Sequence, residues 1–284
     1  MSTKDDQFWN AAGAGDLSAV KKLSTDSSVN VNFLSPKGFT PLSMACLEGR
    51  VLVVEYLLKH PKVDVNLPES GGCTPFFVAC QQGFKEVVKL LLADERIDVN
   101  RPRNSGSTPF FMACHQGQKE VVKLLLADSR IDLNRTMNEG ATPFFIACQD
   151  GHLGVLSLLL ADMRIDIDKP KNDECTPLWM ASQNGRLAVV QLILASGRDV
   201  DTKAKSVEGT AKWNNKTAAE IAGFQVSRAK HAGESEEDFA RKKQSCHLIA
   251  ALLDAHEQNP QQARIQLRKL LGFAGTDAIA LLFD

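Results

Sequence analysis

Residues 108–117 read Thr-Pro-Phe-Phe-Met-Ala-Cys-His-Gln-Gly, and close copies of this stretch recur at intervals of 34 residues. The other copies begin at Thr40, Thr74, Thr142 and Thr176. A period kept without drift indicates one structural unit repeated in tandem, in which each copy packs only against its neighbours. A stack of such units presents a long surface rather than an enclosed pocket, so the repeat predicts a binding scaffold.

The copy that begins at Thr108 gives the local structure expected of all of them. Thr108 caps the N-terminus of a helix, and Pro109 takes its first position, where a missing N–H costs no helical hydrogen bond. This helix stops at Gly117, and apolar residues at helical spacing predict a second helix over 119–126. Residues 130–134, which contain the apolar-Asn ending of the copy, are expected to form an extended arm.

Helix, turn, helix and projecting hairpin, opened by Thr-Pro and closed by Asp-Val-Asn, resemble the ankyrin repeat. Tetratricopeptide repeats have the same 34-residue period, but their pattern contains neither the Thr-Pro start nor the extended arm. The resemblance covers about residues 5–255. It implies an all-α ankyrin-repeat solenoid of stacked helix-turn-helix units with projecting β-hairpin loops.

The units differ in ways that predict the domain organisation. Residues 1–37 lack Thr-Pro but keep the frame, as expected of a polar N-terminal capping repeat. Residues 38–209 hold the five Thr-Pro repeats, and residues 210–256 hold a degenerate repeat whose phrase begins at Thr217, 41 residues after Thr176. Residues 257–284 form a C-terminal helical extension.

The extension carries apolar residues that need a partner surface. Two helices are expected in it, over 261–271 and 277–283. They either fold back over the last repeat or dock on another protein, and self-association through them is the one route by which the chain is expected to leave the monomeric state.

Composition excludes several classes of function. The net charge is −1, with 33 basic and 34 acidic residues well mixed, so no basic stripe for nucleic acid is present. No apolar run approaches the roughly 20 residues that span a bilayer, and the N-terminus has no secretory signal, so no membrane insertion is expected. The seven cysteines lack the spacing of a disulfide framework, which predicts a reducing compartment, the cytoplasm or the nucleus.

Two repeat columns are interpreted as core. The column that most often holds His in ankyrin repeats is mostly aromatic here and is expected to fill the space between units. It contains Ser43, Phe77, Phe111, Phe145 and Trp179. A second column needs a small buried side chain and contains Cys46, Cys80, Cys114, Cys148 and Ser182.

Two polar ladders are also interpreted as structural. Asp and Arg recur two residues apart at Asp94/Arg96, Asp128/Arg130 and Asp162/Arg164, and neighbouring units are expected to pair these charges. The side chains of the arm residues Asn66, Asn100 and Asn134 are expected to tie the hairpin backbone.

The residues after the Cys column are the best candidates for partner contact. Ankyrin proteins point these side chains into a concave groove, and here they are mostly polar and uncharged. They are Leu47, Glu48, Gln81, Gln82, His115, Gln116, Gln149, Asp150, Gln183 and Asn184.

The hairpin tips vary more than the helices, and variable loops on a rigid scaffold often carry recognition. The candidates are Lys37, Glu69, Arg103, Asn104, Asn138, Glu139, Asp173 and Trp213. Trp213, on a seven-residue insertion, is of the residue type that anchors interfaces, although it is equally expected to fold onto the last repeat. Glu174 replaces the glycine of its turn, which predicts strain or a reshaped loop there.

No constellation for catalysis, metal or cofactor binding is found. The six histidines are scattered, and neither a phosphate-binding loop nor a nucleophile elbow is present. The sequence therefore predicts a non-enzymatic scaffold that binds an unidentified protein through the concave helix face and the hairpin tips. The alternative is a structural component of a larger assembly, or a regulatory subunit, tethered by its C-terminal helices.

Overall fold

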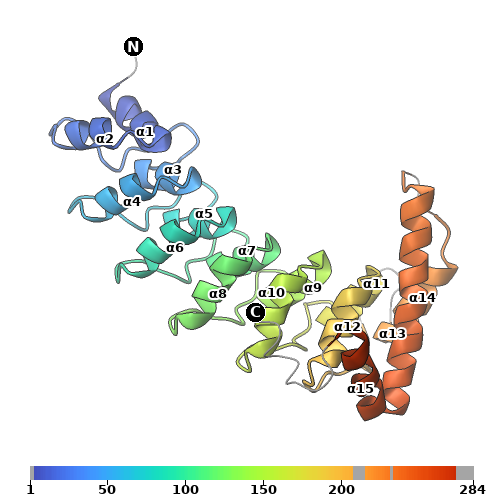
Figure 1. Cartoon of the computed structure of the whole chain (residues 1–284). Coiled ribbons are helices and arrows are strands. Elements are labelled where there is room, and N and C mark those ends of the chain that lie inside the picture. The colour runs from blue at the N-terminus through green and yellow to red at the C-terminus, as the bar shows by residue number, and fades with distance from the viewer. Residues whose placement is uncertain (1–2, 207–214, 231–232, 273–284) are drawn as a thin grey trace. The chain divides into compact units, whose positions relative to one another are not determined.

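The computed structural model describes residues 3–206, 215–230 and 233–272. The chain divides into two compact units, Met1–Asn138 (unit 1) and Glu139–Asp284 (unit 2). Each unit is built from helices and loops, and no strand occurs among the described residues. Figure 1 shows the helices of both units along the chain.

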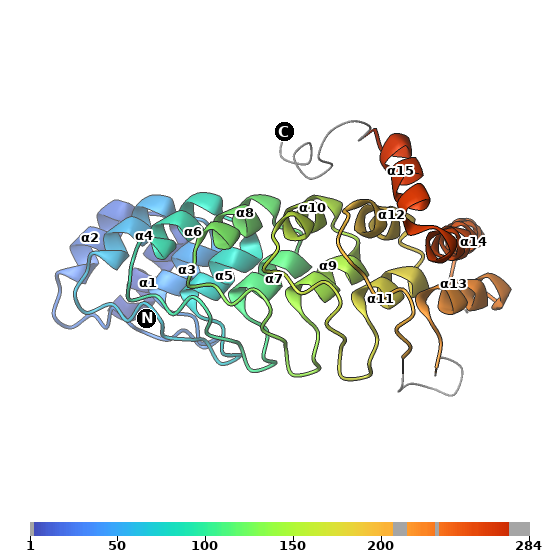
Figure 2. The same cartoon turned by 90° about the horizontal axis from the view of Figure 1, so that it is seen from below.

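The described part of unit 1, residues 3–138, contains four helix pairs. They are α1 (Lys4–Ala14) and α2 (Leu17–Ser24), α3 (Pro41–Leu47) and α4 (Val51–Leu58), α5 (Pro75–Gln82) and α6 (Lys85–Leu92), and α7 (Pro109–His115) and α8 (Lys119–Ala127). The first helices of the pairs pack side by side in one row and the second helices in another (Figure 2). The loops that join consecutive pairs project on the side of the first-helix row; we call these loops fingers.

Unit 2 continues with the same kind of pair. It contains α9 (Pro143–Asp150) and α10 (Leu153–Ala161), α11 (Pro177–Gln183) and α12 (Leu187–Ala195), α13 (Ala218–Ser227) and α14 (Glu236–Gln258), and α15 (Pro260–Leu270). Helices α9, α11 and α13 pack in series, while α14 packs along α13 and also contacts α11 and α12.

The Thr-Pro phrase forms the same helix start five times. In each copy the Thr side chain accepts the backbone N–H three residues later, and Pro takes the first helical position. For Thr108 the acceptor bond from the N–H of Phe111 is 3.1 Å long. The predicted role of the phrase as a helix start is therefore confirmed. A cap of this type contributes about 1 kcal/mol to stability.

Both predicted core columns are buried. Phe77, Phe111, Phe145 and Trp179 are each at most 3% exposed, and the Cys column with Ser182 is fully buried. Burial raises the pKa of the thiols of Cys46, Cys80, Cys114 and Cys148 above the ordinary cysteine value. These cysteines therefore stay protonated and serve as packing residues.

The two tryptophans of the aromatic column also donate hydrogen bonds. Trp9 lies 34 residues before Ser43, in the same column, and its indole N–H donates to the carbonyl of Phe39 at 2.9 Å. The indole N–H of Trp179 donates to the carbonyl of Lys216 at 3.0 Å. Each acceptor directly precedes the Thr that caps the next helix, so the indoles fasten the base of a finger to the helix beneath it.

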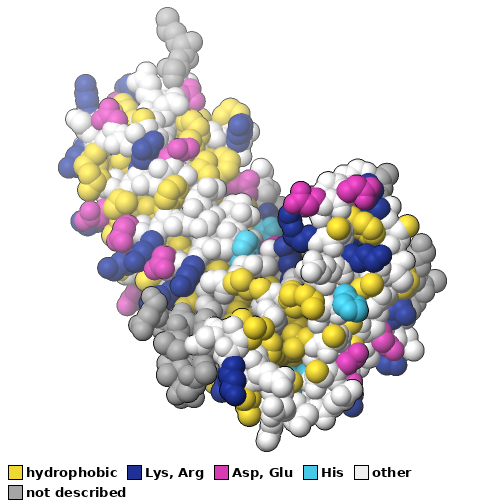
Figure 3. Space-filling view, turned by 45° about the vertical axis from the view of Figure 1, so that its right-hand side comes forward, with side chains coloured by type: hydrophobic (Ala, Val, Ile, Leu, Met, Phe, Trp, Pro, Cys, Tyr) yellow, Lys and Arg dark blue, Asp and Glu magenta, His cyan; other side chains and the backbone are white. Residues whose placement is uncertain are grey.

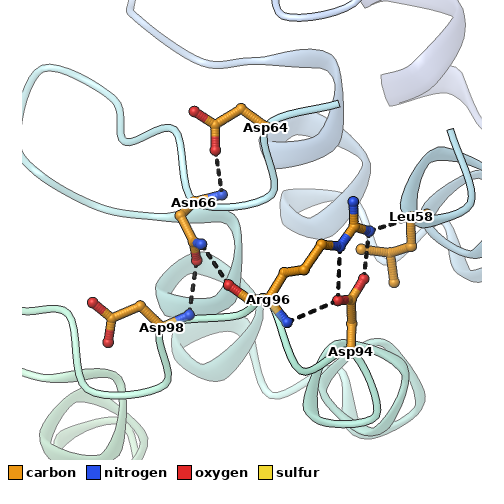
Figure 4. A network of polar contacts seen from close by, with 6 residues as sticks. All are labelled: Leu58, Asp64, Asn66, Asp94, Arg96 and Asp98. Atoms are coloured by element: carbon orange, nitrogen blue, oxygen red, sulfur yellow. Dashed lines mark hydrogen bonds and ion pairs between the residues drawn. The ribbon is translucent and has the colours of Figure 1, made fainter. Parts of the chain in front are cut away.

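The arm asparagines link successive repeats. In Figure 4 the Asn66 amide donates to the carbonyl of Arg96 at 2.7 Å and accepts the N–H of Asp98 at 2.9 Å. Asn32 and Asn100 make the corresponding pair of bonds to the following arm. Each of these Asn side chains thus bonds to the backbone of the next arm, and not to that of its own hairpin.

The Asp–Arg ladder differs from the expectation that neighbouring units pair their charges. Arg96 pairs with Asp94 of its own repeat at 2.6 Å and donates across the repeat boundary to the carbonyl of Leu58, at the end of α4 (Figure 4). Hydrogen bonds from Arg96 lower the pKa of Asp94. The guanidinium also binds this free carbonyl because a helix C-terminus carries partial negative charge.

Helix α15 packs on α12 and α14. Its Ala263 and Leu267 are buried, and Arg268 donates through Nε to the carbonyl of Ala195 at the end of α12, at 3.1 Å. Arg96 makes an equivalent hydrogen bond to the carbonyl at the end of α4. The first helix of the extension therefore folds back on the repeats, while the helix expected over 277–283 lies outside the described residues.

The turn at Glu174 has the same backbone geometry as the turns of those fingers that have glycine at the equivalent position. Its φ is 60°, and its N–H donates to the carbonyl of Lys171 at 2.9 Å. Gly72 and Gly106 make the same bond with φ values of 87° and 82°. The loop is therefore strained rather than reshaped, because a side chain disfavours the left-handed region.

Replacing Glu174 with glycine is expected to stabilise the protein by about 0.5–1 kcal/mol, since relief of strain exceeds the extra entropy that glycine loses on folding. The melting temperature should rise by about 1–4 °C. Asn215, with a φ of 58°, is the matched control. Asn tolerates the left-handed region better than Glu, so Asn215→Gly should give a smaller rise; an equal or larger one would refute this account.

Candidate partner-binding surface

The residues after the Cys column end the first helices, and we call them the first-helix face. In unit 1, Glu48, Gln82 and Gln116 are exposed at or next to the ends of α3, α5 and α7. The residue before each of them is half-buried: Leu47, Gln81 and His115. The exposed members alternate with packed ones, so each of the three repeats with α3, α5 and α7 offers one long polar side chain to a partner.

In unit 2 the first-helix face is less open. Gln149, Asp150, Gln183 and Asn184 are all half-buried. The amide of Asn184 donates to the carbonyl of Gln149 at 3.5 Å, and Arg186 donates to the same carbonyl at 3.2 Å. One side chain of the first-helix face, Asn184, is therefore already bonded in the contact between α9 and α11.

A further column fixes the first helices and is not among the columns predicted from the sequence. Arg50 donates through Nε to the carbonyl of Gly13 at 2.8 Å, and Gln118 donates to the carbonyl of Gln81 at 3.0 Å. These residues follow the glycine that ends each phrase and, with Arg186, recur at multiples of 34. The same period that revealed the other columns could have identified them.

The finger tips of unit 1 are bonded to one another. Asn104 donates its backbone N–H to the carbonyl of Gly71 at 3.0 Å and its side-chain amide to that of Ser70 at 3.2 Å. Asn138 donates in the same way to Ser105 at 3.1 Å and to Asn104 at 3.2 Å. Both side chains hold neighbouring fingers in register, and their contact with a partner stays a prediction.

Glu69 and Arg103 are half-buried in their fingers. The Glu69 carboxylate accepts the N–H of Cys73 at 3.0 Å; burial opposes its ionisation, but backbone hydrogen bonds outweigh burial and lower its pKa. Arg103 donates to the hydroxyl of Ser105 at 2.8 Å and lies 5.8 Å from the centroid of the Phe77 ring. Lys37, by contrast, is exposed on the first finger.

In unit 2, the exposed Glu139 lies 3.6 Å from Lys171, which also lies 3.5 Å from Asp173. These charges largely neutralise one another at the finger tips. Trp213, the aromatic candidate from the sequence, lies outside the described residues.

The surface charge is mixed. In the space-filling view of Figure 3, basic and acidic side chains are interspersed over the visible face. None of the described helices is long and apolar enough to cross a membrane. Over residues 3–206, 215–230 and 233–272, no three His, Cys, Asp or Glu side chains converge as metal ligands would.

Comparison with known proteins identifies the family. A family model of ankyrin repeats in three copies matches residues 8–103, 62–137, 93–171 and 110–204, which together cover more than half of the chain. The chain belongs to the ankyrin-repeat family. Members of this family are generally scaffolds for protein–protein interaction.

A solved ankyrin structure agrees with the fold. The crystal structure of the ankyrin repeat domain of Bcl-3, a unique member of the IkappaB protein family, matches with a TM-score of 0.67 and 20% sequence identity. The match covers 87% of this chain and 100% of that one. At this identity the likeness supports the ankyrin solenoid and says nothing of shared partners.

Proposed function

We propose that this ankyrin protein binds a partner protein through the first-helix face and the adjoining fingers, without catalysis. The observation that carries the proposal is the row of exposed polar residues Glu48, Gln82 and Gln116, one per repeat, on rigidly stacked helices. A row at fixed spacing on a preorganised scaffold loses little entropy on binding. Its long amides are suited to hydrogen bonding with a peptide backbone or polar side chains.

The alternative, an assembly component tethered by its C-terminal helices, has one observation in its favour. Ile265 and Leu270 of α15 are 49% and 72% exposed. The other side of α15, however, packs against α12 and α14, so the helix already has a partner within its own chain. We therefore rank the first-helix face above the C-terminal helix.

The test compares two double variants in capture of the partner from a lysate of the source cells, quantified by mass spectrometry. Gln82→Ala with Gln116→Ala is expected to reduce recovery of the partner at least about tenfold, as for central interface residues. Lys89→Ala with Lys123→Ala is the matched control, because these residues are also exposed and 34 residues apart, on α6 and α8. The control should retain the partner.

A third variant, Ile265→Ser with Leu270→Ser, tests the alternative without removing α15 from α12. Loss of the partner in this variant, together with retention in the Gln82/Gln116 variant, would reject the proposal in favour of a C-terminal tether. Melting curves of all three variants should match that of the unmodified chain, since every substituted residue is exposed.

A further inference from the structure

The aromatic column is covered differently in different repeats of unit 1. Over Phe77 lies the guanidinium of Arg103, which the next finger supplies. Two repeats earlier, the residues in register are Trp9 on α1 and Ser35 on the first finger, each 68 positions before its counterpart. Serine is too short to cover a ring, so the first repeat has the aromatic platform without the cation.

The space that Arg103 fills in the third repeat is open in the first. A hollow of about 360 Å³ lies between α1 and the first finger. It is lined by Asp6, Trp9, Asn10, Ser35, Pro36 and Lys37. Trp9 is half-buried, and its N–H is already bonded to Phe39, so the indole is held in place beside the hollow. A volume near 300 Å³ or above is typical of a small binding pocket.

The rim of the hollow supplies a negative charge. Asp6 lies three residues before Trp9 on α1, and thus on the same side of the helix. Its Oδ2 accepts the N–H and the hydroxyl of Thr3 at 3.0 and 2.8 Å, and no bond to Oδ1 occurs among the described residues. These bonds lower the pKa of Asp6, which keeps it ionised.

We infer that the hollow binds the guanidinium of an arginine from a partner protein, stacked on the Trp9 indole with Asp6 as its counter-ion. Trp is the best of the aromatic rings for binding a cation, and Arg103 over Phe77 shows within this chain that a guanidinium suits the geometry. The inference rests on the proposed scaffold function, because it places one partner side chain beside the first finger, and the fingers are part of the proposed binding surface. Lys37 is an exposed like charge at the rim that weakens this binding without blocking it.

The experiment titrates the intact protein with the peptide acetyl-Gly-Arg-Gly-amide and follows the indole N–H signals by nuclear magnetic resonance. The Trp9 signal, assigned by its loss in Trp9→Phe, should shift saturably, while that of Trp179 should not. The Lys peptide should bind about threefold to tenfold more weakly, because ammonium is more strongly hydrated than guanidinium. The Glu peptide should not bind.

Three variants sharpen the test without removing the ring. Ser35→Arg copies the third repeat and should abolish binding by filling the hollow from within. Lys37→Glu should strengthen binding about threefold, and Asp6→Asn should weaken it by a similar factor.

An unmoved Trp9 signal with the Arg peptide would overturn the inference. So would binding of the Glu peptide that Lys37→Glu abolishes, since the hollow would then be a carboxylate site. Neither result touches the Gln82/Gln116 measurement, so failure of the arginine site is distinguishable from failure of the scaffold function.

Discussion

Replacing Gly106 with alanine is expected to lower the free energy of unfolding by about 2–4 kcal/mol. Gly106 has a φ of +82°, and a Cβ atom there would lie 2.7 Å from the backbone nitrogen of Asn138 and in collision with its Oδ1. The left-handed conformation costs an alanine about 1–2 kcal/mol. Separating the fingers also removes the two hydrogen bonds from Asn138, at about 1 kcal/mol each.

Gly233 provides the control for this variant. Its φ is +87°, but no atom of the described residues lies within 4 Å of a Cβ atom built on it. Gly233→Ala therefore includes the conformational cost without the collision and should destabilise by about 1–2 kcal/mol. Chemical denaturation of both variants measures the difference. If the two lose equal stability, close approach of the fingers contributes nothing and our account of the finger tips is wrong.

The parts of the fold that depend on the repeat period could be predicted from the sequence. Period and phrase together locate Thr108 at a helix start and Cys114 in the core, and α7 and α8 lie within one or two residues of the expected bounds. These features depend on local capping and on burial between identical neighbours. A tandem repeat supplies both, because each unit meets the same surface as the last.

Contacts set by the distance between fingers could not be predicted. Variation at Asn104 and Asn138 suggests recognition, yet their amides bond to the preceding finger. The sequence shows that these residues share a column, but not that glycine lets consecutive turns approach within hydrogen-bonding distance. The Arg96 side chain is a similar case. Its spacing from Asp94 in the sequence does not show that it also bonds to a carbonyl at the end of a helix in the preceding repeat.

The C-terminal helix illustrates a third kind of limit. Its amphipathic pattern predicts a helix, and the structure has it at Pro260–Leu270. Nothing periodic indicates that Arg268 reaches Ala195, because the extension has no counterpart elsewhere in the chain. For the partner surface, likewise, the repeat identifies which residues share a face, while their exposure is set by packing of side chains from neighbouring columns.

Asp168→Asn is expected to stabilise the protein by about 1–2 kcal/mol at pH 7.5. Asp168 is in register with Asn32, Asn66 and Asn100, which each donate to one arm carbonyl and accept one arm N–H. Asp168 accepts the N–H of Asp201 at 3.3 Å, but its buried Oδ1 has no hydrogen-bond partner among the described residues. An amide at this position supplies the missing donor, by analogy toward the carbonyl of Asp199.

The gain should depend on pH in a defined direction. Burial, with repulsion from Asp201, Asp166 and Asp199, raises the pKa of Asp168 from 3.8 to about 6. The folded state therefore binds the Asp168 proton more tightly than the unfolded state, and this contribution to stability is lost as the pH rises from about 4 through about 6. Asn does not titrate, so the advantage of Asp168→Asn should be largest above pH 6 and shrink markedly near pH 4.5.

Thermal melts of both proteins at pH 7.5 and pH 4.5 measure this dependence, with Asp254→Asn as the control for removing a charge. Asp254 is exposed on α14, so its substitution should change stability by no more than about 0.5 kcal/mol at either pH. A gain from Asp168→Asn that is equal at both pH values would show that relief of the buried charge contributes nothing and that the amide acts through its hydrogen bond or its packing. A loss of stability at pH 7.5 would show instead that the carboxylate is a structural partner of the last arm, because only then would removing the buried charge cost more than it relieves.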